Sequence, residues 1–73
     1  MDKETTQMTI IKSLIADERG AIEKYTKLTI SSKSPIISAM FKKIAEDEMH
    51  HLQMLEEYEK IIEQKSCLEI KEN

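Results

Sequence analysis

A single break divides a chain that otherwise favours helix. The 73 residues contain one Pro and one Gly, and the Pro closes the segment Ser31-Ser32-Lys33-Ser34-Pro35. Proline disfavours a helical conformation at the residue before it, and Ser followed by Pro is a common helix start. We therefore predict one domain with helices over about residues 6–30 and 35–65, a turn at 31–35 and a frayed tail at 66–73.

Apolar residues recur at helical spacing on both sides of this break. The short turn makes the two helices antiparallel neighbours, so the predicted fold is an all-α antiparallel two-helix hairpin. A domain this small is marginal alone, and Cys67 is the only cysteine, which excludes a disulfide within the chain. We therefore expect a metal, a partner copy or both to complete the fold. The two stripes comprise Met8, Ile11, Leu14, Ile15, Ala21, Ile22 and Tyr25, then Ile37, Met40, Phe41, Ile44, Ala45, Leu52, Leu55, Tyr58 and Ile62.

Composition and charge exclude several classes of protein. The formal net charge is -3 with Lys and Glu interspersed, so no basic face is expected and nucleic acid is not a predicted partner. No apolar run has the length of a membrane span, and no signal-peptide pattern opens the sequence. The expected location is cytoplasmic, which suits an unpaired cysteine.

Two carboxylates interrupt the apolar stripes. Glu18 and Glu48 each take the place of an apolar residue, and His51 follows Glu48 on the same helix face. Each Glu lies 15 residues from Lys33, at the middle of the turn. At 1.5 Å per residue, both are roughly 20 Å from the turn. The three side chains are therefore predicted to converge at one height of the helix seam.

Carboxylate oxygen and imidazole nitrogen suit iron, manganese and zinc. One hairpin offers three ligands, whereas two hairpins packed across a two-fold axis offer four Glu and two His. That set is the ligand set of di-iron four-helix bundles. Four carboxylates also neutralise two divalent ions. The sequence thus predicts a homodimer, at least, with a two-metal site between the chains, and leaves a larger ring open.

The same residues resemble a known family. Asp17-Glu18-Arg19-Gly20-Ala21-Ile22-Glu23-Lys24-Tyr25 resembles the first ligand helix of rubrerythrin-like proteins, and Ile44-Ala45-Glu46-Asp47-Glu48-Met49-His50-His51-Leu52 resembles the second. The resemblance covers about residues 8–60, which is half of a ferritin-like four-helix bundle. Encapsulated ferritins, whose two-helix chains pair around a di-iron centre, have a similar architecture.

The resemblance implies a ferroxidase for iron storage or detoxification. Fe(II) and dioxygen would be substrates, and Glu18, Glu48 and His51 would be the catalytic metal ligands at a di-iron site. Tyr25 would hydrogen-bond to a ligand carboxylate. Manganese and zinc stay open as alternative metals. An encapsulating shell protein, and thus a nanocompartment location, is left open as well, although the tail shows no clear targeting signal.

Two other functions fit the same residues. One is a rubrerythrin-like scavenger of peroxide or oxygen that uses a separate electron donor. The other is a non-catalytic helical hairpin that oligomerises, because Glu-x-x-His also arises by chance in Glu-rich helices and both acids could reach solvent. His50 is expected on the outer side of its helix. No role is predicted for Cys67.

Overall fold

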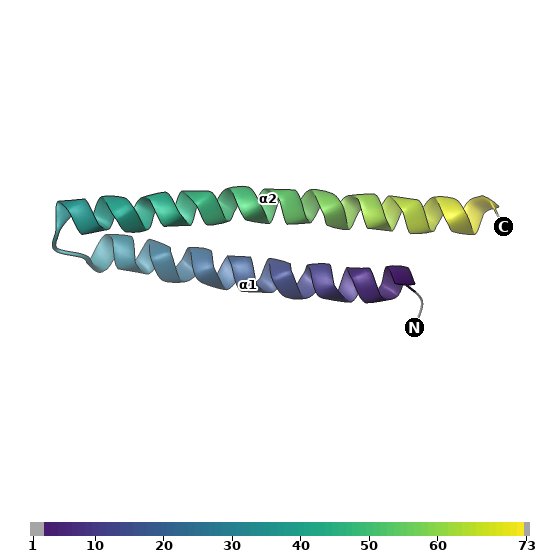
Figure 1. Cartoon of the computed structure of the whole chain (residues 1–73), viewed down its shortest axis with the longest axis horizontal. Helices are drawn as coiled ribbons and strands as arrows, with labels where there is room; N and C mark the ends of the chain where they lie inside the picture. Colours follow the sequence, from purple (N-terminus) through teal and green to yellow (C-terminus); the bar gives the residue numbers. More distant parts are fainter. Residues whose placement is uncertain (1–2, 73) are drawn as a thin grey trace.

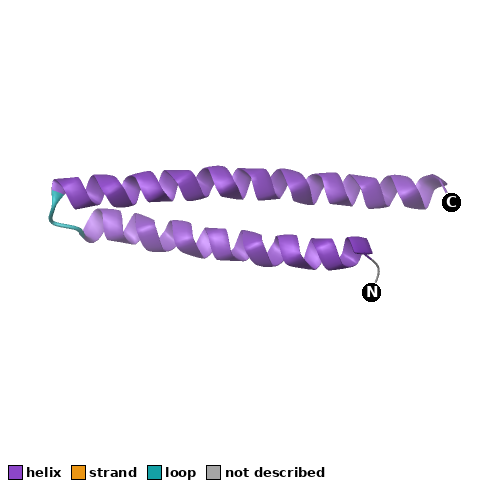
Figure 2. Cartoon of the chain, viewed as in Figure 1, coloured by secondary structure: helices purple, strands orange, loops and turns teal. Residues whose placement is uncertain are grey.

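The chain forms two long helices that lie side by side (Figure 1). The computed structural model describes residues 3–72, and it describes side chains over residues 6–65. Helix α1 spans Lys3–Ser31 and helix α2 spans Pro35–Glu72. Figure 2 shows helix and one short connection, with no strand in the described part of the chain. The predicted all-α antiparallel hairpin is confirmed.

The turn forms because serine side chains satisfy the backbone groups that the helix ends leave free. The Ile37 amide donates to Ser34 Oγ at 3.3 Å, so Ser34 is the N-cap of α2. The Ser38 hydroxyl donates to the Thr29 carbonyl at 2.7 Å and links the start of α2 to the end of α1. No residue of the described backbone needs a positive φ. The predicted role of Ser34 and Pro35 as the start of the second helix is therefore confirmed.

Both helices are longer than the sequence pattern suggests. Helix α1 begins at Lys3 rather than near residue 6, and α2 continues to Glu72 rather than ending near residue 65. The sequence after Pro35 contains no Gly or further Pro, and its Glu, Lys, Leu and Ile residues favour helix. The expected frayed tail thus has a helical backbone up to Glu72, whereas its side chains lie outside those described.

The hairpin is one helix thick. Its extents are 59 × 18 × 12 Å, and the shortest is about the diameter of a single α-helix. Among the side chains of residues 6–65, the buried hydrophobic ones are Ile15 and Ala45, at 5% and 7% exposure. Domains normally bury their apolar faces between two layers. Residues 3–72 form a seam between two helices but no second layer.

Many apolar side chains consequently face solvent. No helix in the described part of the chain has the length and apolarity to cross a membrane. The large hydrophobic residues that are exposed are Ile10, Leu14, Ile30, Ile36, Ile37, Met40, Met49, Met54, Tyr58 and Ile61.

Replacement of the helix cap tests the account of the turn. We expect Ser34→Ala to lower the free energy of unfolding by about 1 kcal/mol, because the Ile37 amide loses its acceptor. Thermal unfolding followed by circular dichroism measures the change. The matched control is Ser31→Ala, whose hydroxyl makes an exposed contact of 3.5 Å within its own helix. Equal losses in the two variants would contradict the capping role.

Candidate metal centre

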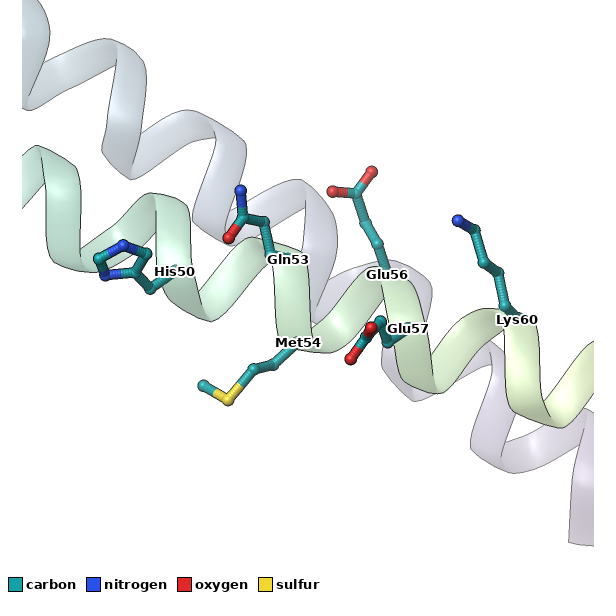
Figure 3. A pocket seen from close by; sticks show the side chains of 6 residues that line it. All are labelled: His50, Gln53, Met54, Glu56, Glu57 and Lys60. Carbon is teal, nitrogen blue, oxygen red and sulfur yellow. The ribbon is translucent and has the colours of Figure 1, made fainter.

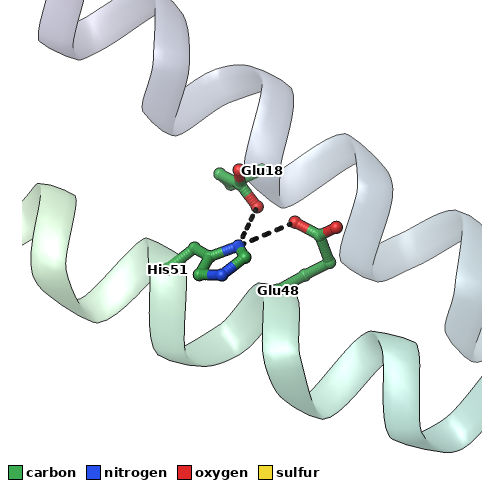
Figure 4. A network of polar contacts seen from close by, with 3 residues as sticks. All are labelled: Glu18, Glu48 and His51. Atoms are coloured by element: carbon green, nitrogen blue, oxygen red, sulfur yellow. Dashed lines mark ion pairs between the residues drawn. The ribbon is translucent and has the colours of Figure 1, made fainter.

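Glu18 and Glu48 approach each other from facing helices (Figure 4). Glu18 projects from α1 and Glu48 from α2, and their side chains are 24% and 23% exposed. Residues three, four and seven positions apart share one face of a helix. The neighbours of each Glu at these spacings form the apolar stripe that faces the other helix, so each Glu belongs to that stripe. Two half-buried carboxylates thus occupy a seam whose other residues are mostly apolar.

His51 completes the group from α2. Its Nδ1 atom lies 3.6 Å from Glu48 Oε2 and 4.0 Å from Glu18 Oε2, as the dashed lines in Figure 4 indicate. Both distances exceed those of a good hydrogen bond. One potential ligand atom from each of the three residues lies within 4.8 Å of the others. The structure thus brings together Glu18, Glu48 and His51, the three residues that the sequence predicts at equal distance from the turn.

The carboxylate of Glu18 is incompletely compensated. Its Oε2 atom is buried and lacks a hydrogen-bond partner among the described residues. A hydrogen bond between the Glu18 and Glu48 carboxyl groups raises the pKa of Glu18 above its ordinary value. Burial and the negative charge of Glu48 raise the pKa of Glu18 further, while His51 opposes the shift. Without a cation, this site favours a protonated Glu18.

The donor set fits a transition metal. Carboxylate oxygen and imidazole nitrogen bind zinc at about 2.0–2.2 Å, so two ligand atoms of one such ion lie at most ~4.4 Å apart. The observed limit of 4.8 Å needs only a small rotamer adjustment to reach that value. Three donors leave the coordination of an ion incomplete, and the His51 side chain is 50% exposed. The open part of the site therefore faces away from the hairpin.

Tyr25 lies outside this group. Its ring is half-buried and packs against Phe41 of α2, with ring centroids 6.1 Å apart. Lys24 Nζ lies 5.4 Å from the centre of the same ring. These contacts give Tyr25 a packing role near the turn. The hydrogen bond from Tyr25 to a ligand carboxylate stays a prediction.

The opposite side of the seam is polar. One residue after Glu18, the helix has turned by about 100°, and Arg19 there forms an ion pair with Glu56 of α2 at 3.6 Å. The sequence did not reveal this pair, because the register of long side chains across a seam is not fixed by spacing alone.

His50 also lies on the outer side of α2, as expected. It lines a shallow groove, shown in Figure 3, with Gln53, Met54, Glu56, Glu57 and Lys60.

Comparison with protein-family models, with curated proteins and with solved structures gives no match for this chain.

The raised pKa of Glu18 predicts how metal-free stability depends on pH. The folded state holds the Glu18 proton more tightly than the unfolded state does, so stability falls as pH rises above the unfolded pKa near 4.5. Glu18→Gln removes this loss. We expect the variant to gain about 1 kcal/mol, or ~4–8 °C in Tm, at pH 7 and little at pH 4.

Chemical or thermal unfolding of chelator-treated protein at both pH values measures this gain. The control is Glu23→Gln, because Glu23 is exposed and paired with Lys27 at 2.9 Å. Its replacement removes a weak surface ion pair and should not stabilise the protein. A Glu18→Gln variant that is less stable than the parent at pH 7 would contradict the assignment.

Proposed function

We propose that this protein is a ferritin-like ferroxidase that binds two iron ions between two copies of the chain. The observation that carries the proposal is the buried Oε2 atom of Glu18, which accepts no hydrogen bond from the described residues and lies beside Glu48 and His51. Carboxylates are rarely buried without a partner, and a bound cation is one such partner. All three donors would then serve one ion.

The incomplete donor set supports a second copy. One hairpin supplies two carboxylates and one imidazole, which do not neutralise two divalent ions. Two copies supply four carboxylates and two imidazoles, so two Fe(II) ions would be held at zero net charge. Glu from one helix and Glu-x-x-His from its neighbour is the ligand arrangement of di-iron bundles. The half-exposed His51 would lie where the second copy closes the site.

The chemistry of the reaction follows from the ligands. Two Fe(II) ions give up one electron each, and dioxygen with two protons takes up both electrons to form hydrogen peroxide. Hard carboxylate oxygens suit Fe(III) as well as Fe(II), so the ligand set accommodates the product charge. The residues of the chain hold both ions close together, which allows one dioxygen molecule to accept the electron pair.

Iron titration tests the proposal. Anaerobic addition of Fe(II) to chelator-treated protein, followed by air, should bind about one iron per chain and produce the near-ultraviolet absorbance of oxo-bridged Fe(III). We expect Glu48→Ala to reduce iron uptake at least tenfold, because it removes a ligand carboxylate from each copy. The absence of uptake by the parent protein would contradict the proposal.

A nearby acid provides the matched control. Glu46 is exposed, lies two residues before Glu48 on the same helix and does not belong to the three-residue group. Glu46→Ala should therefore bind iron as the parent does. Equal loss in both variants would indicate non-specific attraction of cations by acidic residues. That result would also overturn the proposal.

Two further outcomes identify the alternative functions. If reduced protein consumes hydrogen peroxide faster than dioxygen oxidises its iron, the site belongs to a peroxide scavenger with a separate electron donor. If the chain oligomerises but takes up no metal, the exposed apolar residues serve a non-catalytic hairpin module. In that case Glu18→Leu should stabilise the assembly, since it replaces a half-buried acid with an apolar side chain.

A further inference from the structure

Positive charge gathers at the turn end of the hairpin, by which we mean residues 24–44. This segment holds five lysines and no Asp or Glu, whereas residues 45–64 hold seven acids and one lysine. The turn lies at one end of the molecule, and the start of α1 and the end of α2 lie toward the other (Figure 1). The expectation that Lys and Glu are interspersed therefore does not hold at the turn end. Its lysines are Lys24, Lys27, Lys33, Lys42 and Lys43.

These lysines are available to an anionic partner. Lys33 and Lys42 form no ion pair with a residue in the described part of the chain. Lys27 and Lys43 each pair with an acid four residues away, at 2.9 and 3.1 Å, but their side chains are 74% and 71% exposed. Ion pairs at such exposed positions are weak, so an anionic surface can compete for both lysines.

Exposed isoleucines lie beside the turn on both helices. Ile30 is 80% exposed and Ile36 is 74% exposed, the two largest values among the described large hydrophobic residues. Ile30 follows Arg19 by eleven residues, about three helical turns, so it shares the side of α1 that carries the Arg19–Glu56 ion pair. A second copy that covers the His51 side of the hairpin would therefore leave Ile30 exposed.

Polar groups of the turn are hydrogen-bonded within the hairpin. The Ser32 amide donates to the Leu28 carbonyl at 3.0 Å, and the Ser34 amide donates to Ser32 Oγ at 3.3 Å. Ser34 Oγ caps α2, and the Ser38 hydroxyl donates to the Thr29 carbonyl. A polar group that already has a partner costs less to move out of water. The turn can therefore approach an apolar medium without leaving these groups unpaired.

We propose that the turn end binds the surface of an anionic lipid bilayer, with Ile30 and Ile36 inserted at the boundary between headgroups and acyl chains. Both isoleucines lie three residues from Lys33, or roughly 5 Å along the helices. The other four lysines lie 6–10 residues from Lys33, or roughly 9–15 Å. Interfacial segments enter this boundary by about 5–10 Å, so the isoleucines reach acyl chains while the lysines stay near the lipid phosphates.

The acidic part of the chain is compatible with this orientation. The acids nearest the turn are Glu23 and Glu46, which lie 10 and 13 residues from Lys33, or roughly 15 and 20 Å. Surface charge is screened within about 8–10 Å at physiological ionic strength. When the turn end is bound, most of the negative charge therefore lies beyond the range of the surface. Repulsion opposes any orientation that brings residues 45–64 to the bilayer.

A helical protein partner fits these features less well. Ile36 and Met40 line a shallow hollow on α2, which an acidic amphipathic helix would cover. That helix would lie along α2 and leave Ile30 of α1 exposed. A bilayer meets the whole end of the hairpin and takes up isoleucines from both helices. The hollow is lined by Pro35, Ile36, Ala39, Met40, Lys43 and Ile44.

Vesicle binding tests the proposal. The protein should bind vesicles of equimolar phosphatidylglycerol and phosphatidylcholine about tenfold or more tightly than vesicles of phosphatidylcholine alone, because the lysines add electrostatic attraction. Salt at about 0.5 M should weaken this binding. Co-sedimentation measures the affinities. Absence of binding, or equal binding to both vesicle types, would overturn the proposal.

A charge-matched pair of double variants tests the lysines. Lys33→Glu with Lys42→Glu should abolish the preference for anionic vesicles. Lys60→Glu with Lys65→Glu changes the net charge equally but lies far from the turn, so it should retain the preference. Circular dichroism checks that both variants remain helical. Equal losses would show that only net charge matters and would overturn the role of the turn end.

Tryptophan labels test insertion, since the chain has no Trp of its own. Ile30→Trp and Ile36→Trp should each shift their emission to shorter wavelength when anionic vesicles are added. The control is Ile61→Trp, because Ile61 is 57% exposed and in phase with Ile36 but lies 28 residues from Lys33. A shift at Ile36 without one at Ile30, or an equal shift in all three, would overturn insertion of the turn end.

Iron uptake separates this proposal from the proposed function. The Lys33→Glu, Lys42→Glu variant should take up iron as the parent does, and Glu48→Ala should bind anionic vesicles as the parent does. Vesicle binding by a parent protein that takes up no iron would keep this proposal and overturn the ferroxidase. Binding of polyglutamate but not of vesicles would assign the turn end to an acidic protein and overturn the lipid partner.

Discussion

A layer of two helices has only one internal line of contact. Each helix turns one stripe toward the other, and every other side chain faces outward. The 12 Å thickness of the hairpin leaves no room for a second layer. Among the described side chains, Ile15 and Ala45 are the hydrophobic residues that this contact buries. The rest of the structure follows from this shortage of buried apolar surface.

Because so little apolar surface is buried, the two seam carboxylates have a large effect on the stability of the hairpin. A protein with a large hydrophobic core stays folded even when one buried acid is poorly paired. In this hairpin, Glu18 and Glu48 occupy two of the few positions that face the other helix. Without a cation they weaken the seam whenever both are ionised, because the Glu48 charge and burial oppose ionisation of Glu18 and no described residue donates a hydrogen bond to Glu18 Oε2. With a divalent ion bound between them, both carboxylates would attract the ion, and this attraction would outweigh their mutual repulsion. In the proposed protein, metal binding and folding therefore stabilise each other.

The sequence predicts the hairpin and the convergence of the three residues because both depend on local rules. Ser34 and Pro35 define the start of α2, and equal counts from Lys33 place Glu18 and Glu48 at one height. Other features depend on tertiary geometry that spacing does not determine. These include the ion pair of Arg19 with Glu56 and the half-exposed position of His51. They also include a groove that Tyr58 of α2 lines together with Ile10 and Ile11 of α1. The predicted end of α2 near residue 65 is wrong, because weak apolar periodicity beyond that residue does not stop a helix that lacks Gly and further Pro.

The two wide faces of the hairpin differ, and this difference limits how copies stack. One face, which we call the apolar face, includes Ile10, Met40 and Tyr58 together with the metal group. The opposite face carries the Arg19–Glu56 ion pair and the groove near His50. In the proposed dimer the apolar faces cover each other and the polar faces stay outside, so face-to-face stacking stops at two copies. A larger ring would have to use the outer edge of α2. Ile36, Met54 and Ile61 lie there at one helical phase, and each is more than half exposed.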